Sequence, residues 1–177
     1  MVGLLEETDI DFCTHVAARR FERYRGHFGV YQTKASNSLS SHLVGVLGEY
    51  AVQKLLLSRY TLVKDWEDID GSEYDFQIHG IPIEVKTWSN EYWTNLGRCI
   101  RPAHLPKYKR DIAIIIWSSV WLDISEITIH GWNYASDISD RHKTKTGRYK
   151  IDNYQIPDQE IRPIETLLDY IDSEILK

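Results

Sequence analysis

The fold of this chain is decided by residues 74–86, which have the sequence YDFQIHGIPIEVK. The dipeptide His79-Gly80 separates two runs in which polar and apolar residues alternate. This pattern is typical of a β-hairpin with a two-residue turn. Such a turn places Asp75 directly opposite Glu84 on the neighbouring strand.

The predicted hairpin has one polar and one apolar face, because the side chains of a strand alternate between the two sides of a sheet. The polar face carries Asp75, Gln77, Pro82, Glu84 and Lys86. The apolar face carries Tyr74, Phe76, Ile78, Ile81, Ile83 and Val85. A shift of one residue would bury the carboxylates, so burial fixes the register. Carboxylates that face each other across a sheet repel, and a cation between them would relieve that repulsion.

The remaining sequence predicts one mixed α/β or α+β domain over residues 1–177. Apolar residues recur at helical spacing over 10–24, 41–58 and 163–175, with an N-cap at Ser40 or Ser41 for the second helix. Further strands are expected at 60–66, 112–117, 120–131 and 149–156, and a short helix is expected after Pro102. The run 112–117 is continuously apolar, which indicates a strand buried on both faces.

The acids and the lysine of the hairpin suit metal-assisted hydrolysis of a phosphodiester bond. Mg²⁺ prefers oxygen ligands, so Asp75 and Glu84 would supply two ligands and the backbone carbonyl of Val85 a third. The ion would polarise a phosphoryl oxygen and lower the pKa of a bound water, and Mn²⁺ is expected to substitute for it. Lys86 lies one pleat beyond Glu84, where its ammonium could orient the attacking water or stabilise charge on phosphorus.

A further acidic candidate, Glu49, lies on the helix predicted over 41–58. This helix is largely apolar but carries a polar stripe of His42, Gly45, Glu49 and Gln53. Gly45 and Gly48 each cost about 1 kcal/mol relative to alanine inside a helix, which indicates close packing at both. Glu49 could add a water-mediated ligand or hold a second ion. The alternative for Glu49 is an exposed helix residue.

The pattern of Asp75, a gap of eight residues and then Glu84-Val85-Lys86 resembles the PD-(D/E)xK nuclease superfamily, the restriction endonuclease-like fold. The resemblance implies a core of a helix, three strands, a helix and a strand over residues 41–117. Its central mixed four-stranded sheet would be flanked by helices, with residues 118–177 as extra strands and a helix. It also implies that Asp75 and Glu84 bind metal, that Lys86 is catalytic and that Glu49 assists. Tyr74 stands where the family has proline.

Basic residues are segregated, although the net charge is −5. Residues 98–110 and 141–150 contain no acid, and residues 19–25 contain only Glu22. Phosphate contact depends on the local field, so these runs are candidates for binding DNA. The candidate contacts are Arg98, Arg101, Lys107, Lys109, Arg110, Arg141, Lys143 and Lys145. The alternative for each run is a solvated face.

The predicted function is therefore a Mg²⁺-dependent endonuclease that acts on DNA. A homodimer would fit, because cutting both strands needs two sites. One alternative is a catalytically silent nucleic-acid-binding or assembly domain with the same fold. Another is a glycoside hydrolase with Asp75 and Glu84 as its paired carboxylates, although this leaves Lys86 unexplained. A surface salt bridge from Lys86 to either acid is the purely structural alternative.

Other sequence features restrict the location and the chemistry. Cys13 and Cys99 form no metal-type spacing, which indicates a reducing, cytoplasmic setting. The seven histidines also lack paired spacing, so no zinc site is expected. The N-terminal residues are acidic and the run 112–117 is too short to cross a bilayer, so no membrane partner is expected. No Ser-His-Asp order or glycine-rich phosphate loop supports acyl transfer or nucleotide hydrolysis.

Overall fold

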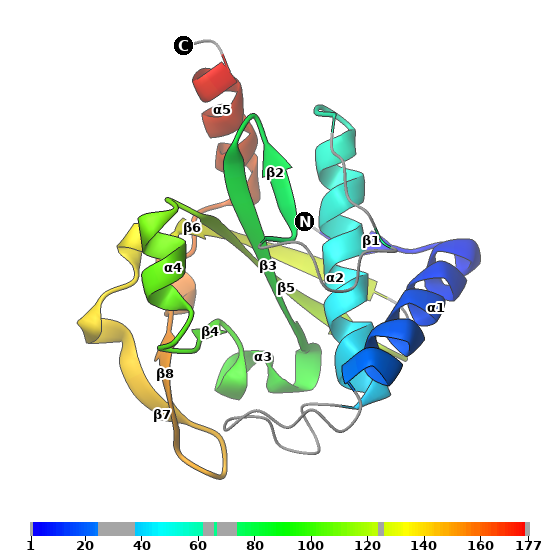
Figure 1. Cartoon of the computed structure of the whole chain (residues 1–177), viewed down its shortest axis with the longest axis horizontal. Coiled ribbons are helices and arrows are strands. Elements are labelled where there is room, and N and C mark those ends of the chain that lie inside the picture. Colours follow the sequence, from blue (N-terminus) through cyan, green and yellow to red (C-terminus); the bar gives the residue numbers. More distant parts are fainter. Residues whose placement is uncertain (1, 25–37, 62–65, 67–73, 124–125, 176–177) are drawn as a thin grey trace.

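The computed structural model describes residues 2–24, 38–61, 66, 74–123 and 126–175. A mixed β-sheet lies at the centre of this part of the chain, with helices and a smaller sheet around it (Figure 1). The helices are α1 (Glu7–Tyr24), α2 (Leu39–Leu57), α3 (Asn90–Leu96), α4 (Leu105–Arg110) and α5 (Ile164–Ile175). The strands are β1 (Val2–Leu4), β2 (Phe76–Ile78), β3 (Ile81–Ser89), β4 (Cys99–Ile100), β5 (Ile114–Trp121), β6 (Glu126–Tyr134), β7 (Lys143–Thr146) and β8 (Ile151–Gln155). Short 3-10 turns are η1 (Ala135–Asp137), η2 (Asp140–His142) and η3 (Asp158–Glu160).

The central sheet has the strand order β1-β6-β5-β3-β2. Within it β3 and β5 are parallel, whereas the other neighbouring strands are antiparallel. The sheet is mixed, as predicted, and it contains three of the four strands expected for the core, β2, β3 and β5. Its other described members are β6 and the edge strand β1 of three residues, which lie outside the predicted core of residues 41–117. A separate antiparallel sheet has the order β4-β8-β7. The fold class is therefore mixed α/β, as the sequence predicted.

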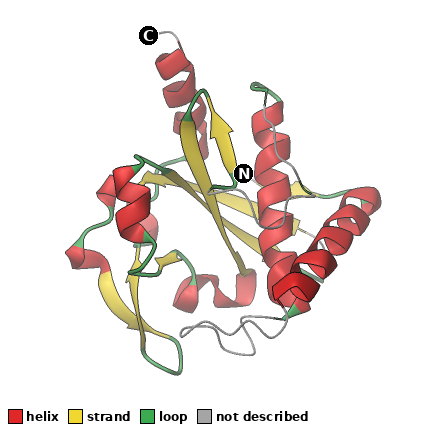
Figure 2. Cartoon of the chain, in the orientation of Figure 1, coloured by secondary structure: helices red, strands yellow, loops and turns green. Residues whose placement is uncertain are grey.

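Both faces of the central sheet are covered by apolar side chains from other elements. One face packs on α2 and α5, through residues such as Val52 and Leu167. The opposite face packs on α3, α4 and the small sheet, through residues such as Trp93 and Tyr108. Figure 2 shows α1 and α2 on the right of the view and the small sheet at the lower left. The strand between the two layers, β5, is buried on both faces along almost its whole length, as its continuous apolar run predicts.

The two long helices pack against each other along a third apolar cluster, with Cys13 of α1 and Leu47 of α2 among its members. Asp9 of α1 lies at this interface. Its carboxylate accepts a hydrogen bond from the Tyr50 hydroxyl at 2.8 Å and pairs with Lys54 at 2.7 Å. These polar contacts fix how α1 lies along α2. Of the helices in the described ranges, none is long and apolar enough to cross a membrane.

The boundaries of two elements differ from the sequence prediction. The cap of α2 is Ser38, not Ser40 or Ser41, because Ser38 and Ser41 form a reciprocal capping box at 3.1 Å. The strand predicted over 112–117 begins at Ile114 and continues to Trp121. Ile112 is exposed, with a φ of 55°, because it lies in the turn that ends α4.

Gly131 does not end a strand, contrary to the prediction, since β6 continues to Tyr134. The register of β5 and β6 shifts by one residue beside Gly131, which has a φ of 149°. A Cβ atom there would lie 2.0 Å from the backbone oxygen of Arg162. The glycine therefore permits the bridge between Trp132 and Arg162, which joins the C-terminal segment to the sheet.

Three further predictions concern shorter elements. The strand predicted over 60–66 falls partly on residues 62–65, which lie outside the described residues, and Tyr60 itself is not in a strand. The short helix after Pro102 and the last strand are present as α4 and β8. The helix α3 and the strand β7 were not predicted, because neither segment has a clear apolar period.

Candidate active site

The hairpin predicted over residues 74–86 is present, and it has the expected two-residue turn. His79 and Gly80 have φ values of 47° and 82°. Positive φ at both central positions is the requirement of a type I′ turn. The register pairs Ile78 with Ile81 and Phe76 with Ile83, which is the predicted register.

The predicted pairing of Asp75 with Glu84 is not part of the ladder, which ends with Phe76 and Ile83. The strand β2 begins one residue later, at Phe76. Oδ2 of Asp75 accepts a hydrogen bond from the backbone N–H of Val85 at 2.7 Å. The N–H and C=O of a strand residue point to the same side, so the Val85 carbonyl also lies at this edge of β3.

Tyr74 departs from the predicted alternation. The sequence placed it on the apolar face beside Phe76, but it packs in the opposite cluster, with its ring centroid 6.0 Å from that of Tyr108. Its hydroxyl donates to Oδ2 of Asp111 at 2.5 Å. The prediction is wrong because residues 74 and 75 form a bend, so strand alternation begins only at Phe76.

Glu84 and Lys86 share one face of β3 and form an ion pair. Oε1 of Glu84 also accepts a hydrogen bond from the Tyr108 hydroxyl at 2.8 Å. The side chains of Glu84 and Lys86 are 12% and 25% exposed, respectively. Burial alone would lower the pKa of Lys86, but Glu84, Tyr108 and Asp75 outweigh it, so the pKa of Lys86 is raised. Lys86 is therefore an ammonium at neutral pH.

Glu49 lies on α2 and is 8% exposed, so the alternative of an exposed helix residue is wrong. Its two carboxylate oxygens accept hydrogen bonds from Arg20 of α1 at 2.8 and 2.9 Å. Burial opposes the charge of Arg20, but Glu49 and then Asp75 raise its pKa overall. Arg20 therefore links Glu49 and Asp75 electrostatically, a connection that the sequence analysis missed.

Lys86 also lines a cleft of about 530 Å³ between β3, the segment from α3 to α4 and the β7–β8 hairpin. Its basic lining residues are Lys86, Arg101, His104 and Arg148. Burial, followed by the charges of Lys86 and Arg101, lowers the pKa of His104. None of the described residues that line this cleft is an aspartate or a glutamate. The cleft thus presents positive charge beside the predicted catalytic lysine.

The structure removes Arg98 from the predicted nucleic-acid contacts. Its side chain is 8% exposed and pairs with Asp158 at 3.0 Å. The guanidinium also donates to the backbone oxygens of Ile156 at 2.8 Å and Trp93 at 3.1 Å. Arg98 therefore holds α3 against the segment that follows β8, and its donors are not available to phosphates.

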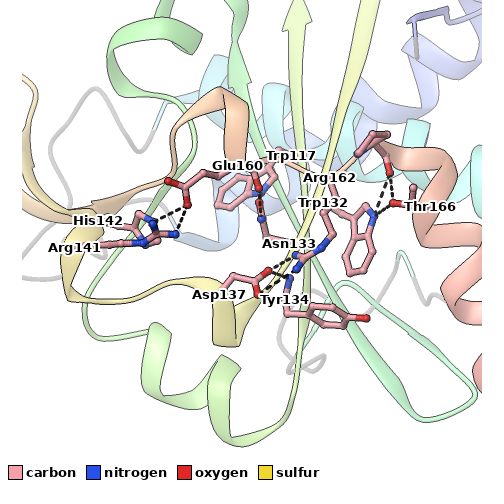
Figure 3. A network of polar contacts seen from close by, with 11 residues as sticks. Trp117, Trp132, Asn133, Tyr134, Asp137, Arg141, His142, Glu160, Arg162 and Thr166 are labelled. Carbon is pink, nitrogen blue, oxygen red and sulfur yellow. Dashed lines mark hydrogen bonds and ion pairs between the residues drawn. The ribbon is translucent and has the colours of Figure 1, made fainter.

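The predicted contacts of the second basic run form ion pairs with acids from outside that run. The pairs are Arg141–Glu160 at 2.6 Å, Lys143–Asp140 at 3.0 Å and Lys145–Asp152 at 2.9 Å. Arg141 belongs to the network in Figure 3, in which Asn133 connects the Glu160 backbone with the indole of Trp117. Exposed ion pairs contribute little stability, so phosphates could replace these acids. Phosphate binding by the three residues stays a prediction.

The three cations of α4 have different surroundings. Lys107 lies 4.5 Å from the centre of the Tyr74 ring. Arg110 pairs with Asp111 at 2.8 Å, and Lys109 is exposed. Their contacts with nucleic acid also stay predictions.

The structure forms a Ser–His pair that no sequence motif indicated. Oγ of Ser119 lies 2.8 Å from Nε2 of His130 and 3.0 Å from Oδ1 of Asn90. Ser119 is fully buried, and the His130 ring stacks on Trp93 with their centroids 3.7 Å apart. A substrate cannot reach this hydroxyl, so the pair supports the packing of α3 on the sheet rather than acyl transfer.

Among the described residues, no three His, Cys, Asp or Glu side chains gather into a group that could hold a metal ion. Comparisons with protein-family models, with curated proteins and with solved structures found no match for this chain. Arg20, Tyr108 and Arg148 are the additions that the fold makes to the predicted site.

Proposed function

We infer that the protein is a metal-dependent nuclease that hydrolyses phosphodiester bonds in DNA. One observation carries this proposal. In the hairpin, the charges of Glu84 and Asp75 raise the pKa of Lys86. Lys86 also lies in the wall of a cleft lined with basic residues. Two acids, a charged lysine and a site for phosphates are the parts that hydrolysis of a phosphodiester requires.

Three oxygen donors of the hairpin suit Mg²⁺ by their chemistry. They are the carboxylates of Asp75 and Glu84 and the carbonyl of Val85. Mg²⁺ is commonly bound through one or two carboxylates and keeps several waters, so two acids are sufficient. When bound, the ion would polarise a phosphoryl oxygen and lower the pKa of a water ligand. Mn²⁺, which also accepts oxygen ligands, would substitute.

Lys86 serves as a positive charge rather than as a base in this proposal, because its raised pKa keeps it protonated. An ammonium stabilises the negative charge that develops on the phosphate oxygens. Tyr108 positions Glu84 through its hydrogen bond at 2.8 Å. The pair of Glu49 and Arg20 fixes a second cation near Asp75, so Glu49 assists through Arg20.

The order of the elements supports a restriction endonuclease-like core. A helix, α2, precedes the hairpin β2–β3, which is followed by two short helices and by β5, parallel to β3. The first of the family's three strands would fall at 60–66, where residues 62–65 lie outside the described residues. Because one fold can serve many functions, this order supports the architecture, and the side chains carry the activity.

One structural observation favours the alternative of a catalytically silent nucleic-acid-binding domain. Oε1 of Glu84 already contacts both Lys86 and Tyr108, so a metal ion would compete with these partners. In a silent domain the ion pair would be the resting arrangement. Binding without hydrolysis distinguishes this alternative from the nuclease.

The proposal is tested by incubating supercoiled plasmid, linear duplex and single strands with the protein and Mg²⁺ or Mn²⁺. Wild type is compared with Asp75→Ala and Lys86→Ala. The control variants Asp123→Ala and Arg59→Ala change an exposed acid and an exposed base outside the cleft. We expect cleavage by wild type and both controls, and none by the two site variants or in EDTA.

The other outcomes separate the alternatives. If wild type binds these nucleic acids but cuts none of the three substrates, the silent domain is supported. Cleavage that persists in Asp75→Ala and Lys86→Ala would place the active site elsewhere. Hydrolysis of a glycoside that survives EDTA would support the glycosidase, since that reaction needs the two carboxylates and no metal.

A further inference from the structure

The cleft beside Lys86 contains two arginines that differ from most of the predicted basic contacts. Arg101 follows β4, and Arg148 lies in the turn between β7 and β8. Across the ranges that the structure describes, no carboxylate lies within ion-pair distance of either guanidinium, whereas Arg141, Lys143 and Lys145 are all paired. The positive charge of each guanidinium is therefore available to an anion from solution.

An aromatic side chain accompanies these two charges. Tyr149 follows Arg148 in the turn and is 71% exposed, the most exposed large hydrophobic residue of the described chain. It lines the cleft together with Trp88 of β3, which itself stacks on the buried Trp117 with ring centroids 6.2 Å apart. The cleft thus combines a fixed aromatic wall, a solvent-exposed tyrosine and two available guanidinium groups.

We propose that this cleft binds an unpaired nucleotide of the substrate, with its base against Tyr149 and Trp88 and its phosphates on Arg101 and Arg148. Base stacking on aromatic side chains and cationic contact with the backbone are the two interactions that bind single-stranded nucleic acid. The inference rests on the proposed nuclease for the identity of the ligand. It adds that the substrate is single-stranded or locally unpaired at the site of cleavage.

The dimensions and the position of the cleft favour an unpaired strand over a duplex. A volume of about 530 Å³ is in the range of small-ligand pockets, so it suits one or two nucleotides. Within a duplex the bases are stacked on one another, and a nucleotide must leave the stack to enter such a pocket. Lys86 lines the same cleft, so a nucleotide bound there would place its phosphate beside the catalytic lysine.

The test measures binding, which needs no cleavage. Fluorescence anisotropy of a labelled single-stranded 12-mer and of the corresponding duplex is recorded in EDTA over a range of salt concentrations. The variants are Tyr149→Ala, Tyr149→Phe and Arg148→Ala. Tyr92→Ala is the matched control, because Tyr92 is an exposed tyrosine on α3 that does not line the cleft.

We expect wild type to bind the single strand more tightly than the duplex. Tyr149→Ala should weaken single-strand binding about tenfold, while Tyr149→Phe and Tyr92→Ala should bind like wild type. Arg148→Ala should reduce the slope of log K against log salt by about 0.7. Equal affinity for strand and duplex, or unchanged binding by Tyr149→Ala, would overturn the inference. Binding as expected by a protein that cleaves nothing in Mg²⁺ would instead contradict the proposed nuclease and leave this inference standing.

Discussion

Oδ2 of Asp75 lies 2.7 Å from the backbone nitrogen of Val85 and accepts its hydrogen bond. The carboxylate therefore occupies the position in which a longer β2 would have placed a backbone acceptor. This contact ends the strand and holds the acid at the edge of β3, next to Glu84 and Lys86. The observed hydrogen bond needs only an oxygen from this side chain, whereas the proposed metal site needs its negative charge.

Asp75→Asn separates these two properties. The asparagine oxygen can still accept the Val85 hydrogen bond, but the charge is lost. We expect Mg²⁺-dependent cleavage to fall by about 100-fold or more, the size of effect seen when one electrostatic contact with a transition state is removed. The melting temperature should change by less than about 4 °C. Nicking of supercoiled plasmid and thermal unfolding measure the two effects, and full activity in Asp75→Asn would contradict the assignment.

The coupling between Glu84 and Lys86 can be measured with the variants Glu84→Gln, Lys86→Met and their double mutant. Each single change leaves a largely buried charge without its partner, so each should destabilise the fold by roughly 1–3 kcal/mol. The double mutant removes both charges, and we expect it to be more stable than the sum of the single effects predicts. Urea denaturation gives these free energies. Strict additivity would show that the ion pair makes no net contribution.

The hairpin could be predicted from sequence because its turn dipeptide and its alternation are local signals. The turn fixed the pairing of Phe76 with Ile83, and burial of the apolar face agreed with it. Alternation failed at Tyr74, where a bend replaces the strand and where the partners Tyr108 and Asp111 are distant in sequence. Local periodicity cannot indicate where a strand stops.

The surroundings of the charged residues could not be predicted, because they depend on long-range contacts. The basic run 141–150 contains no acid. Asp152 and Glu160, which come later in the sequence, nevertheless form ion pairs with residues of this run. Arg98 and Arg101 both belong to the acid-free run 98–110, but the side chain of Arg98 is buried, whereas Arg101 lines the cleft. The pair of Arg20 and Glu49 joins residues separated by 29 positions, and no spacing rule connects them.

Arg20 and Glu49 form a two-pronged contact whose geometry should matter as much as its charge. Arg20→Lys keeps the charge but cannot make the two parallel hydrogen bonds observed at 2.8 and 2.9 Å. We expect Arg20→Lys to lose stability by about 1–2 kcal/mol and to reduce cleavage, because the cation near Asp75 is displaced. The control is Arg19→Lys at the neighbouring position of α1. Equal behaviour of the two variants would show that the two-pronged contact is unimportant.

Stability should fall as the solution is acidified, in part because of His130. Burial lowers the pKa of His130 to about 4, while the unfolded chain has the ordinary value near 6.5. Between these values the unfolded state binds a proton that the folded state does not, so each unit decrease in pH removes up to about 1.4 kcal/mol. His42 and His104, whose pKa values are also lowered, act in the same direction.

The contribution of His130 is isolated by His130→Gln, which cannot titrate. Urea midpoints at pH 7 and pH 5 should differ less in His130→Gln than in wild type. The control His15→Gln, at an exposed position of α1, should retain the dependence of wild type. Identical pH dependence in His130→Gln and wild type would contradict the assignment.

The two glycines of α2 should respond to alanine in opposite directions. A Cβ atom on Gly48 would lie 1.9 Å from Oγ1 of Thr87, because α2 packs closely on β3 there. A Cβ atom on Gly45 would meet no described residue within 4 Å, so the prediction of close packing at both glycines is wrong for Gly45. Gly48→Ala should therefore destabilise the fold by about 1–3 kcal/mol. Gly45→Ala should stabilise it by about 0.5–1 kcal/mol through helix propensity.

Thermal unfolding of both variants measures these effects, at roughly 2–4 °C per kcal/mol for a chain of this size. Adding Thr87→Ala to Gly48→Ala removes two of the three Thr87 atoms that the new methyl group would strike, Oγ1 and Cγ2, and leaves Cβ at 2.7 Å. That double variant should recover part of the loss, although it gives up the contact of 2.8 Å between Thr87 and Ser118. If Gly48→Ala and Gly45→Ala shift the melting temperature equally, α2 does not approach β3 as closely as the structure describes. Glu49 follows Gly48 directly in α2. Such a result would therefore imply that the Glu49–Arg20 pair also lies farther from Asp75.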